Sequence, residues 1–180
     1  MLTLFIPGKE FWDEKKEEFC NTKGCTITLE HSLVSLSKWE AKWCKPFLSQ
    51  EDKTSEEIVD YIRFMTLTQN VNPNVYGRLT AGHYDTINKY INAPMTATWF
   101  SKEQNSRKGK EIVTAEVIYY WMIAHNIPFE CQKWHLNRLL TLIKVCNIKN
   151  QPPKKKSRGE LLSRNATLNA ARRKRLGTKG

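Results

Sequence analysis

The stretch from Ile112 to Cys146 places the strongest constraint on the fold. Its first part is apolar on nearly every side from Val117 to Ala124, and a helix that is apolar all round is expected to be buried on all sides. After Pro128, apolar residues recur at three- and four-residue steps, the period of an amphipathic helix. They are Trp134, Leu136, Leu139, Leu140, Ile143 and Cys146. The sequence therefore predicts a helical hairpin: a central buried helix, a short turn and a covering helix.

The N-terminal region predicts a small sheet. Leu2–Ile6 is a short apolar run that stops at a Pro-Gly pair, and Thr26–Glu30 alternates polar and apolar residues as a half-buried strand does. We expect these two segments to pair. The charged segment Phe11–Cys20 between them is interpreted as a helical turn. A two-stranded sheet is marginal alone, so helices are expected to pack against it.

Two capping signals predict the next helices. Ser32 is a suitable N-cap for a helix over residues 33–44, with an apolar stripe of Leu36, Trp39 and Trp43. Thr54 and Glu57 have the spacing of a capping box, and the helix behind them is expected to bury Ile58, Ile62 and Met65. Residues 74–79 and 84–92 are interpreted as short helical segments, and residues 101–110 as a solvent-exposed loop.

The positive charge is concentrated at the C-terminal end. Residues 150–180 hold ten Lys and Arg and one acid, a net charge of +9, whereas the first 149 residues carry +2. A Pro-Pro-Lys-Lys-Lys run opens this region and predicts a stiff, solvated linker. We therefore expect a mainly α protein: a helical bundle over residues 1–149 with a small two-stranded β element near its N-terminus, and a basic arm over residues 150–180 that is helical or disordered.

Several functional classes are disfavoured. The apolar run at 117–124 is too short to span a bilayer, and the N-terminus lacks the pattern of a signal peptide. The odd number and irregular spacing of the five cysteines indicate reduced thiols in a cytosol. The sequence contains no nucleophile elbow, Walker loop or dinucleotide fingerprint, and His31, His83 and Asp85 match no hydrolase pattern. We expect no catalytic residue and no cofactor.

One spacing is compatible with a metal ligand pair. Cys131 and His135 lie four residues apart on the predicted covering helix, so both side chains face the same side. A zinc site needs about two more ligands, and the sequence offers no partner pair with finger spacing, since Cys20 and Cys25 are too loosely placed. The other interpretation, a buried thiol beside a hydrogen-bonded imidazole, is favoured.

Aromatic residues and the basic arm are the candidate binding elements. Trp39 and Trp43 lie one helical turn apart and close to Phe47. Base stacking is conceivable for them, but the mixed local charge favours a core or partner-facing cluster. The basic arm could neutralise phosphates, grip an acidic protein surface or maintain solubility. Its cationic residues are Lys154, Lys155, Lys156, Arg158, Arg164, Arg172, Arg173, Lys174 and Arg175.

Four segments together resemble small proteins encoded in the tail modules of tailed bacteriophages, where the usual assignment is tail assembly chaperone. They are residues 29–40 (LEHSLVSLSKWE), 45–48 (KPFL), 129–140 (FECQKWHLNRLL) and 168–173 (LNAARR). The resemblance covers most of the chain and lies in the texture of whole segments.

The resemblance implies a non-enzymatic, mostly helical protein without catalytic residues. Chaperones of this family coat the long tape-measure protein in the host cytoplasm until tail-tube subunits polymerise around it. Such a protein needs exposed apolar patches, and we expect Trp39, Trp43, Phe47 and Trp99 to supply them. The alternative is a virion structural or accessory protein whose basic arm binds DNA.

Overall fold

The computed structural model describes residues 1–13, 18–49, 51–100, 112–150 and 158–178. They form two compact units, Met1–Asn147 and Ile148–Gly180. The first unit is mainly α-helical with antiparallel strands near the N-terminus, which confirms the predicted fold class. The second unit contains helix α6 (Arg158–Leu176), so the predicted basic arm is helical over that range.

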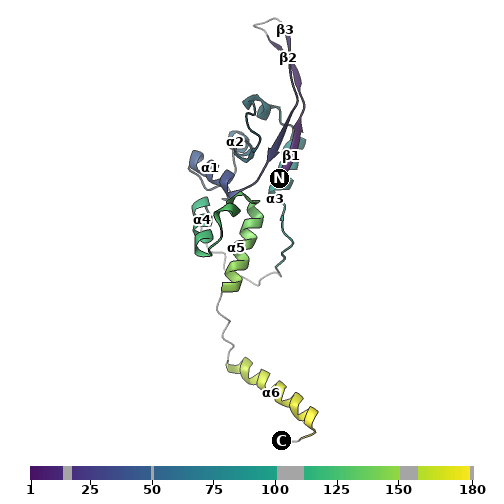
Figure 1. Ribbon diagram of the computed structural model, residues 1–180, viewed down its shortest axis with the longest axis vertical. Coiled ribbons are helices and arrows are strands. Elements are labelled where there is room, and N and C mark those ends of the chain that lie inside the picture. The colour runs from purple at the N-terminus through teal and green to yellow at the C-terminus, as the bar shows by residue number, and fades with distance from the viewer. Residues whose placement is uncertain (14–17, 50, 101–111, 151–157, 179–180) are drawn as a thin grey trace. The chain divides into compact units, whose positions relative to one another are not determined.

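The N-terminal strands form a longer ribbon than predicted. Strand β1 (Leu2–Ile6) pairs antiparallel with β4 (Cys25–Leu29), as expected, and the alternate residues Leu4 and Ile27 face each other and are buried. Strands β2 (Lys9–Asp13) and β3 (Glu18–Thr22) pair in the same sense and extend beyond β1 and β4 (Figure 1). The helical turn predicted over residues 11–20 is therefore wrong.

Gly8 sits where the two strand pairs meet. A Cβ at this position would lie 2.0 Å from the carbonyl oxygen of Thr22, a distance that no side chain can adopt. The backbones of the β1–β2 connection and of β3 approach each other this closely because residue 8 is glycine. The same close approach brings the carbonyl of Pro7 towards Arg78, which donates to it at 3.1 Å.

Both predicted capping signals start a helix. Helix α1 (Leu33–Trp43) begins after Ser32, whose hydroxyl accepts from the Ser35 amide at 3.3 Å. Helix α2 (Ser55–Met65) begins after Thr54, and the capping box closes in both directions between Thr54 and Glu57. The buried face of α2 includes Ile62 and Met65 as expected, but Ile58 is exposed, so its predicted burial is wrong.

The remaining elements of the first unit are helical. They are η1 (Pro73–Arg78), α3 (Ala81–Asn92), α4 (Ala115–Ala124), η2 (Phe129–Lys133) and α5 (Leu136–Asn150). The predicted covering helix thus begins at Leu136, and its first predicted turn is the separate 3₁₀ helix η2. The chain turns between α4 and η2 through Asn126, whose φ is +52°. The loop predicted for residues 101–110 lies outside the described residues.

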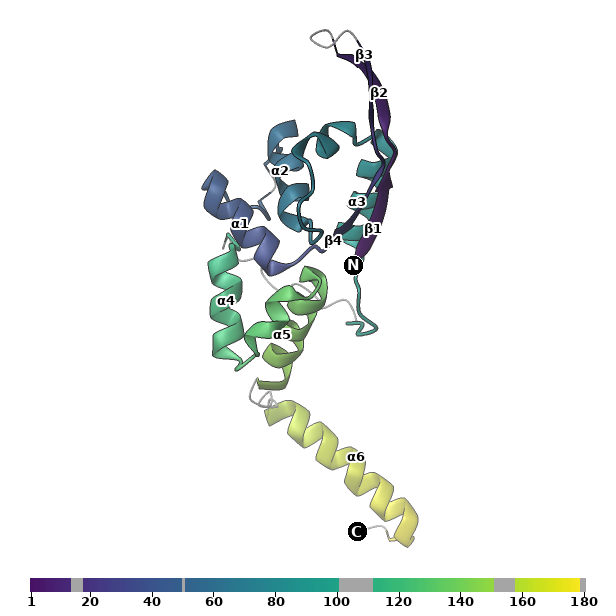
Figure 2. The same cartoon turned by 45° about the horizontal axis from the view of Figure 1, so that its top comes forward.

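Helix α1 joins two hydrophobic cores. Trp39 packs into the first core, with β1, β4, α2, η1 and α3. Leu33 and Leu36 pack into the second, with α4, η2 and α5. Figure 2 shows α1 between α2 on one side and α4 on the other, and α1 contacts both. The central helix of this unit is therefore α1, and the prediction that α4 is central and buried on every side is wrong.

A buried carboxylate connects the two cores. Glu40 of α1 accepts the amide of Phe47 at 2.8 Å through Oε1 and the amide of Ala115 at 2.7 Å through Oε2. Ala115 is the first residue of α4, and Thr114 before it makes no side-chain capping bond. The free amides at a helix N-terminus require acceptors, so Glu40 caps α4 from another helix.

Candidate binding surfaces

Trp39 does not belong to an exposed patch. Its side chain is 1% exposed, and its indole nitrogen donates to the Glu57 carbonyl at 2.8 Å. The expectation that Trp39 supplies exposed aromatic surface is wrong, and the alternative of a core aromatic is confirmed. A tryptophan whose one polar group is satisfied by buried backbone stabilises the contact between α1 and α2.

Trp43 and Phe47 lie at the edge of the same core and are half-buried. The ring of Phe47 stacks on Tyr61 with centroids 4.0 Å apart, and its edge meets Trp39 at 5.0 Å. Lys53 covers Phe47 at 4.7 Å from the ring centroid. Because both faces of Phe47 are engaged by this chain, the cluster closes the core and offers little free aromatic surface.

Trp99 is the predicted contact residue that remains open. Its side chain is 83% exposed, within residues 93–100, which form no helix or strand. The expected exposure of Trp99 is confirmed, and its contact with a partner stays a prediction. Its neighbour Phe100 is half-buried, so Trp99 is the exposed aromatic of this pair.

An exposed apolar surface lies on α4 and η2. Tyr120 is 66% exposed, Ile123 is 60% exposed, and Phe129 of η2 is exposed as well. Tyr120 and Ile123 lie three residues apart and so share one face of the helix. We call Tyr120, Ile123 and Phe129 the α4–η2 surface. Sequence reasoning missed it, because an all-apolar run carries no sign of which side faces water.

The α4–η2 surface is held in place by the residues beneath it. The Tyr119 hydroxyl donates to Gln132 Oε1 at 2.8 Å, and its ring lies 6.4 Å from that of Phe129. The opposite face of α4 buries Ile118 and Met122 in the second core. A fixed aromatic and aliphatic surface loses little conformational entropy on binding. This surface therefore suits a protein contact.

Cys131 is a buried thiol and His135 is a hydrogen-bonded imidazole, as favoured from the sequence. The prediction that both lie on the covering helix is wrong, because Cys131 belongs to η2 and His135 precedes α5. His135 Nε2 donates to the Tyr90 carbonyl at 3.0 Å, and Nδ1 accepts from the Asn137 amide at 3.3 Å. Both ring nitrogens are engaged, so a metal ion would have to displace one bond. Within the described ranges, His, Cys, Asp and Glu side chains form no group of three or more that could hold a metal ion.

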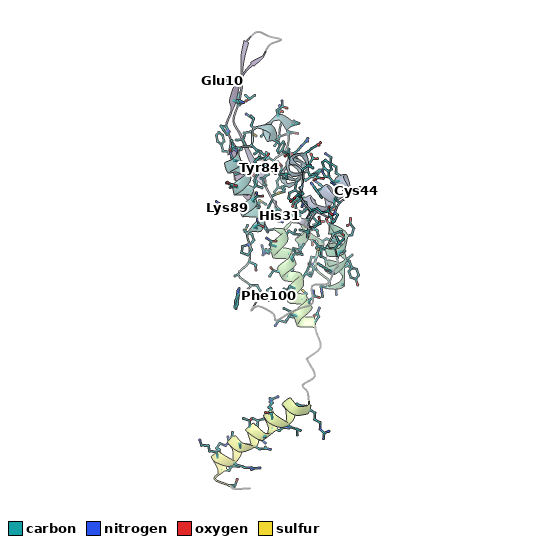
Figure 3. The ribbon with its side chains drawn as sticks, turned by 180° about the vertical axis from the view of Figure 1, so that it is seen from behind. Glu10, His31, Cys44, Tyr84, Lys89 and Phe100 are labelled. Carbon is teal, nitrogen blue, oxygen red and sulfur yellow. The ribbon has the colours of Figure 1, made fainter. Side chains whose placement is uncertain are left out.

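His31 and His135 belong to a buried polar cluster, and Figure 3 shows His31 inside the body of the first unit. Burial, together with the neighbouring His135, lowers the pKa of His31 from 6.5 to about 4. Its Nδ1 lies 2.5 Å from the Tyr61 hydroxyl, whose pKa is raised by burial. Tyr90 donates to Glu30 at 2.7 Å, and burial followed by this bond raises the pKa of Tyr90.

This cluster joins segments distant in sequence and holds its histidines neutral near pH 7. Glu30 also lies 3.1 Å from the N-terminal amine of Met1. At that pH both imidazoles are uncharged and both phenols keep their protons, so the cluster holds no imidazolium or phenolate inside the fold. The arrangement is typical of a structural network that fixes the start of α1 against α3 and α5.

The basic arm presents its cations to solvent. Arg158, Arg164 and the run from Arg172 to Arg175 are all exposed along α6. Four of these cations occupy the last turns, where positive charge also complements the helix dipole. The helix ends at Leu176, and Gly177 after it has a φ of +66°, the left-handed conformation common after a helix C-terminus. The predicted arm residues Lys154, Lys155 and Lys156 lie outside the described residues.

Among the described residues, no helix combines the length and the apolar character needed to cross a bilayer. No protein-family model matches the chain, and neither a curated protein nor a solved structure matches it. The exposure, charge and contacts of the candidate surfaces are therefore the structural evidence on which a function can be proposed.

Proposed function

We propose that this chain is a non-enzymatic phage tail assembly protein that binds the tape-measure or tail-tube proteins in the host cytoplasm. The observation that carries the proposal is the α4–η2 surface, which leaves Tyr120, Ile123 and Phe129 exposed on a rigid support. Large apolar side chains left exposed on one helix face of a folded protein are candidates for a site of association. Tyrosine and aliphatic side chains of this kind are suited to an amphipathic helical partner.

The resemblance to tail assembly chaperones supplies the class of client. A tape-measure protein is long and helical, and it must stay unaggregated until the tube forms around it. A chaperone for such a client needs an apolar contact surface and a well-solvated body. The α4–η2 surface provides the first, and the net charge of +11 provides the second.

The test is co-purification of the full chain with a co-expressed tape-measure segment. We expect the wild-type chain to retain the segment and the double variant Tyr120→Ser/Ile123→Ser to lose it. The matched control is Leu48→Ser/Leu67→Ser, which removes two exposed apolar side chains elsewhere on the first unit. Circular dichroism must show the same fold for all three proteins. Equal capture by both double variants, or no capture by the wild type, contradicts the proposal.

The second candidate function is DNA binding by the basic arm of a virion structural or accessory protein. The exposed cations at Arg172–Arg175 favour it. The logarithm of DNA affinity falls linearly as the logarithm of salt concentration rises, and each phosphate contact adds about 0.9 to the steepness of that line. If α6 binds duplex DNA, replacing these four residues with Gln will reduce the slope by roughly 3 to 4. The measurement is the fluorescence anisotropy of labelled duplex DNA titrated with the wild-type chain at several salt concentrations. Absence of salt-dependent binding would exclude this candidate.

A further inference from the structure

A cavity on the first unit is lined by cations, neutral polar groups and apolar side chains. It has a volume of about 660 Å³ and lies beside the β1–β2 connection, the start of β4, and residues 68–78. Lys9, Lys23 and Arg78 line it, together with the amide side chains of Asn70 and Asn72. None of its lining residues is acidic. A cavity with three cations and no acid carries a strong positive potential.

Arg78 is built into the wall of this cavity. Its Nη1 donates to the Thr22 hydroxyl at 3.0 Å and to the Pro7 carbonyl at 3.1 Å. The Pro7 carbonyl is brought there by the close backbone approach at Gly8, where a Cβ would collide with the carbonyl of Thr22. These bonds to neutral oxygens fix the guanidinium without neutralising its charge.

The guanidinium keeps one edge without a partner. Nε of Arg78 is buried and has no hydrogen-bond acceptor among the described residues, nor does any described carboxylate form an ion pair with Arg78. Because Nε is closed to solvent, a ligand in the cavity would reach the guanidinium through its outer nitrogen Nη2.

We propose that this cavity binds the phosphate group of a small phosphorylated ligand of about mononucleotide size. Arg78 would donate to a phosphate oxygen, Lys9 and Lys23 would neutralise the remaining charge, and the amides of Asn70 and Asn72 would contact the rest of the ligand. The volume falls in the range of roughly 300–1,000 Å³ that small-molecule sites occupy. Three cations around one group match a phosphate, which carries its negative charge on a single centre, better than a dicarboxylate, whose two charges lie on separate carbons.

This site is independent of the proposed client contact. It lies on the β-strands and η1, whereas the α4–η2 surface lies on the second core. A protein that fails to bind a tape-measure segment can still bind phosphate here, and the reverse also holds. The two proposals therefore fail separately.

The test is calorimetric titration of the full chain with inorganic phosphate, adenosine monophosphate and succinate at matched ionic strength. We expect saturable binding of the first two and at least tenfold weaker binding of succinate. Equal binding of succinate would overturn the assignment to phosphate. The absence of saturable binding to either phosphate ligand would overturn the site itself.

Three variants locate the binding. Arg78→Lys keeps the charge but loses the planar group that the Pro7 and Thr22 oxygens hold at the cavity wall, and we expect affinity for adenosine monophosphate to fall at least tenfold. Because Arg78 also holds the Pro7 carbonyl, the double variant Lys9→Gln/Lys23→Gln provides an independent measure, since both residues line the cavity and are exposed. We expect a similar loss. The control is Lys89→Gln, an exposed cation on α3 labelled in Figure 3. Unchanged affinity in the Lys9/Lys23 variant would contradict the proposal.

Discussion

Glu40 should be among the most sensitive positions for stability, because it caps a helix that has no cap of its own. Its carboxylate is buried and accepts the amides of Phe47 and Ala115 at 2.8 and 2.7 Å. In Glu40→Gln one oxygen remains an acceptor, but the new amide group faces a backbone donor. That pairing leaves one buried N–H unsatisfied and places two donors against each other.

The size of the effect follows from these two bonds. A hydrogen bond to a charged group contributes about 1.5–3 kcal/mol. We therefore expect Glu40→Gln to lower the free energy of unfolding by about 2–3 kcal/mol, and Glu40→Ala by about 3–5 kcal/mol, since alanine leaves both amides unpaired. Set against the roughly 5–15 kcal/mol of a typical domain, either loss is large.

The measurement is urea unfolding of the full chain at pH 7, followed by circular dichroism. The matched control is Asp85→Asn, the same carboxyl-to-amide exchange at an exposed position on α3, which we expect to change stability by less than about 0.5 kcal/mol. The midpoint should shift without a change in slope, because the fold is retained. If Glu40→Gln lowers the free energy of unfolding by less than about 0.5 kcal/mol, Glu40 neither caps α4 nor connects the two cores to a measurable extent.

Two further predictions concern stability. The pKa of His31 is 6.5 in the unfolded chain and about 4 in the folded chain, so the unfolded state binds more protons between these two pH values. The contribution of a neutral His31 to the free energy of unfolding should be fully present above pH 6.5. We expect the free energy of unfolding to fall by about 3 kcal/mol as the pH drops from 6.5 to 4. Urea midpoints across this window measure it, and a His31→Gln protein should show a flatter profile; identical profiles would contradict the assignment. Ile118→Ala, at a fully buried position on α4, should cost about 2–5 kcal/mol, whereas Ile123→Ala on the exposed face should change stability by less than about 0.5 kcal/mol. Equal losses in thermal or urea unfolding would show that α4 is buried on both sides.

Local signals in the sequence were sufficient for several elements. The hydroxyl-to-carboxylate spacing at Thr54 and Glu57 determines a helix start by itself, because both partners of the capping box are within one turn. The alternation in β1 and β4 determines which side chains are buried once the strands pair. These features depend on neighbours in sequence, so no tertiary information was needed.

Features that depend on tertiary contacts were not predictable. The charged segment around β2 and β3 has a poor strand pattern, yet it continues the antiparallel pairing begun by β1 and β4. Helix α1 bears exposed Lys38 and Lys42 and has a weaker apolar signature than α4, but it contacts both cores. Tertiary packing overrode intrinsic propensity in both cases.

The candidate surfaces show the same division. Trp99 was identified from the sequence, whereas Trp39 was placed on a surface although its indole nitrogen bonds inside the core. The exposure of Tyr120 and Ile123 was missed because a uniformly apolar helix has no polar face to mark the solvent side. Arg78 belongs to no sequence motif, and its bonds to Pro7 and Thr22 join residues that are far from it in sequence.

Hydrogen–deuterium exchange on the wild-type chain, with and without a tape-measure segment, tests most directly where a client binds. If the α4–η2 surface is the contact, amides of residues 115–133 will gain protection in the complex, and the Tyr120→Ser/Ile123→Ser protein will show no such gain. Protection confined to α6, or an exchange pattern that the segment leaves unchanged, would contradict the assignment of that surface.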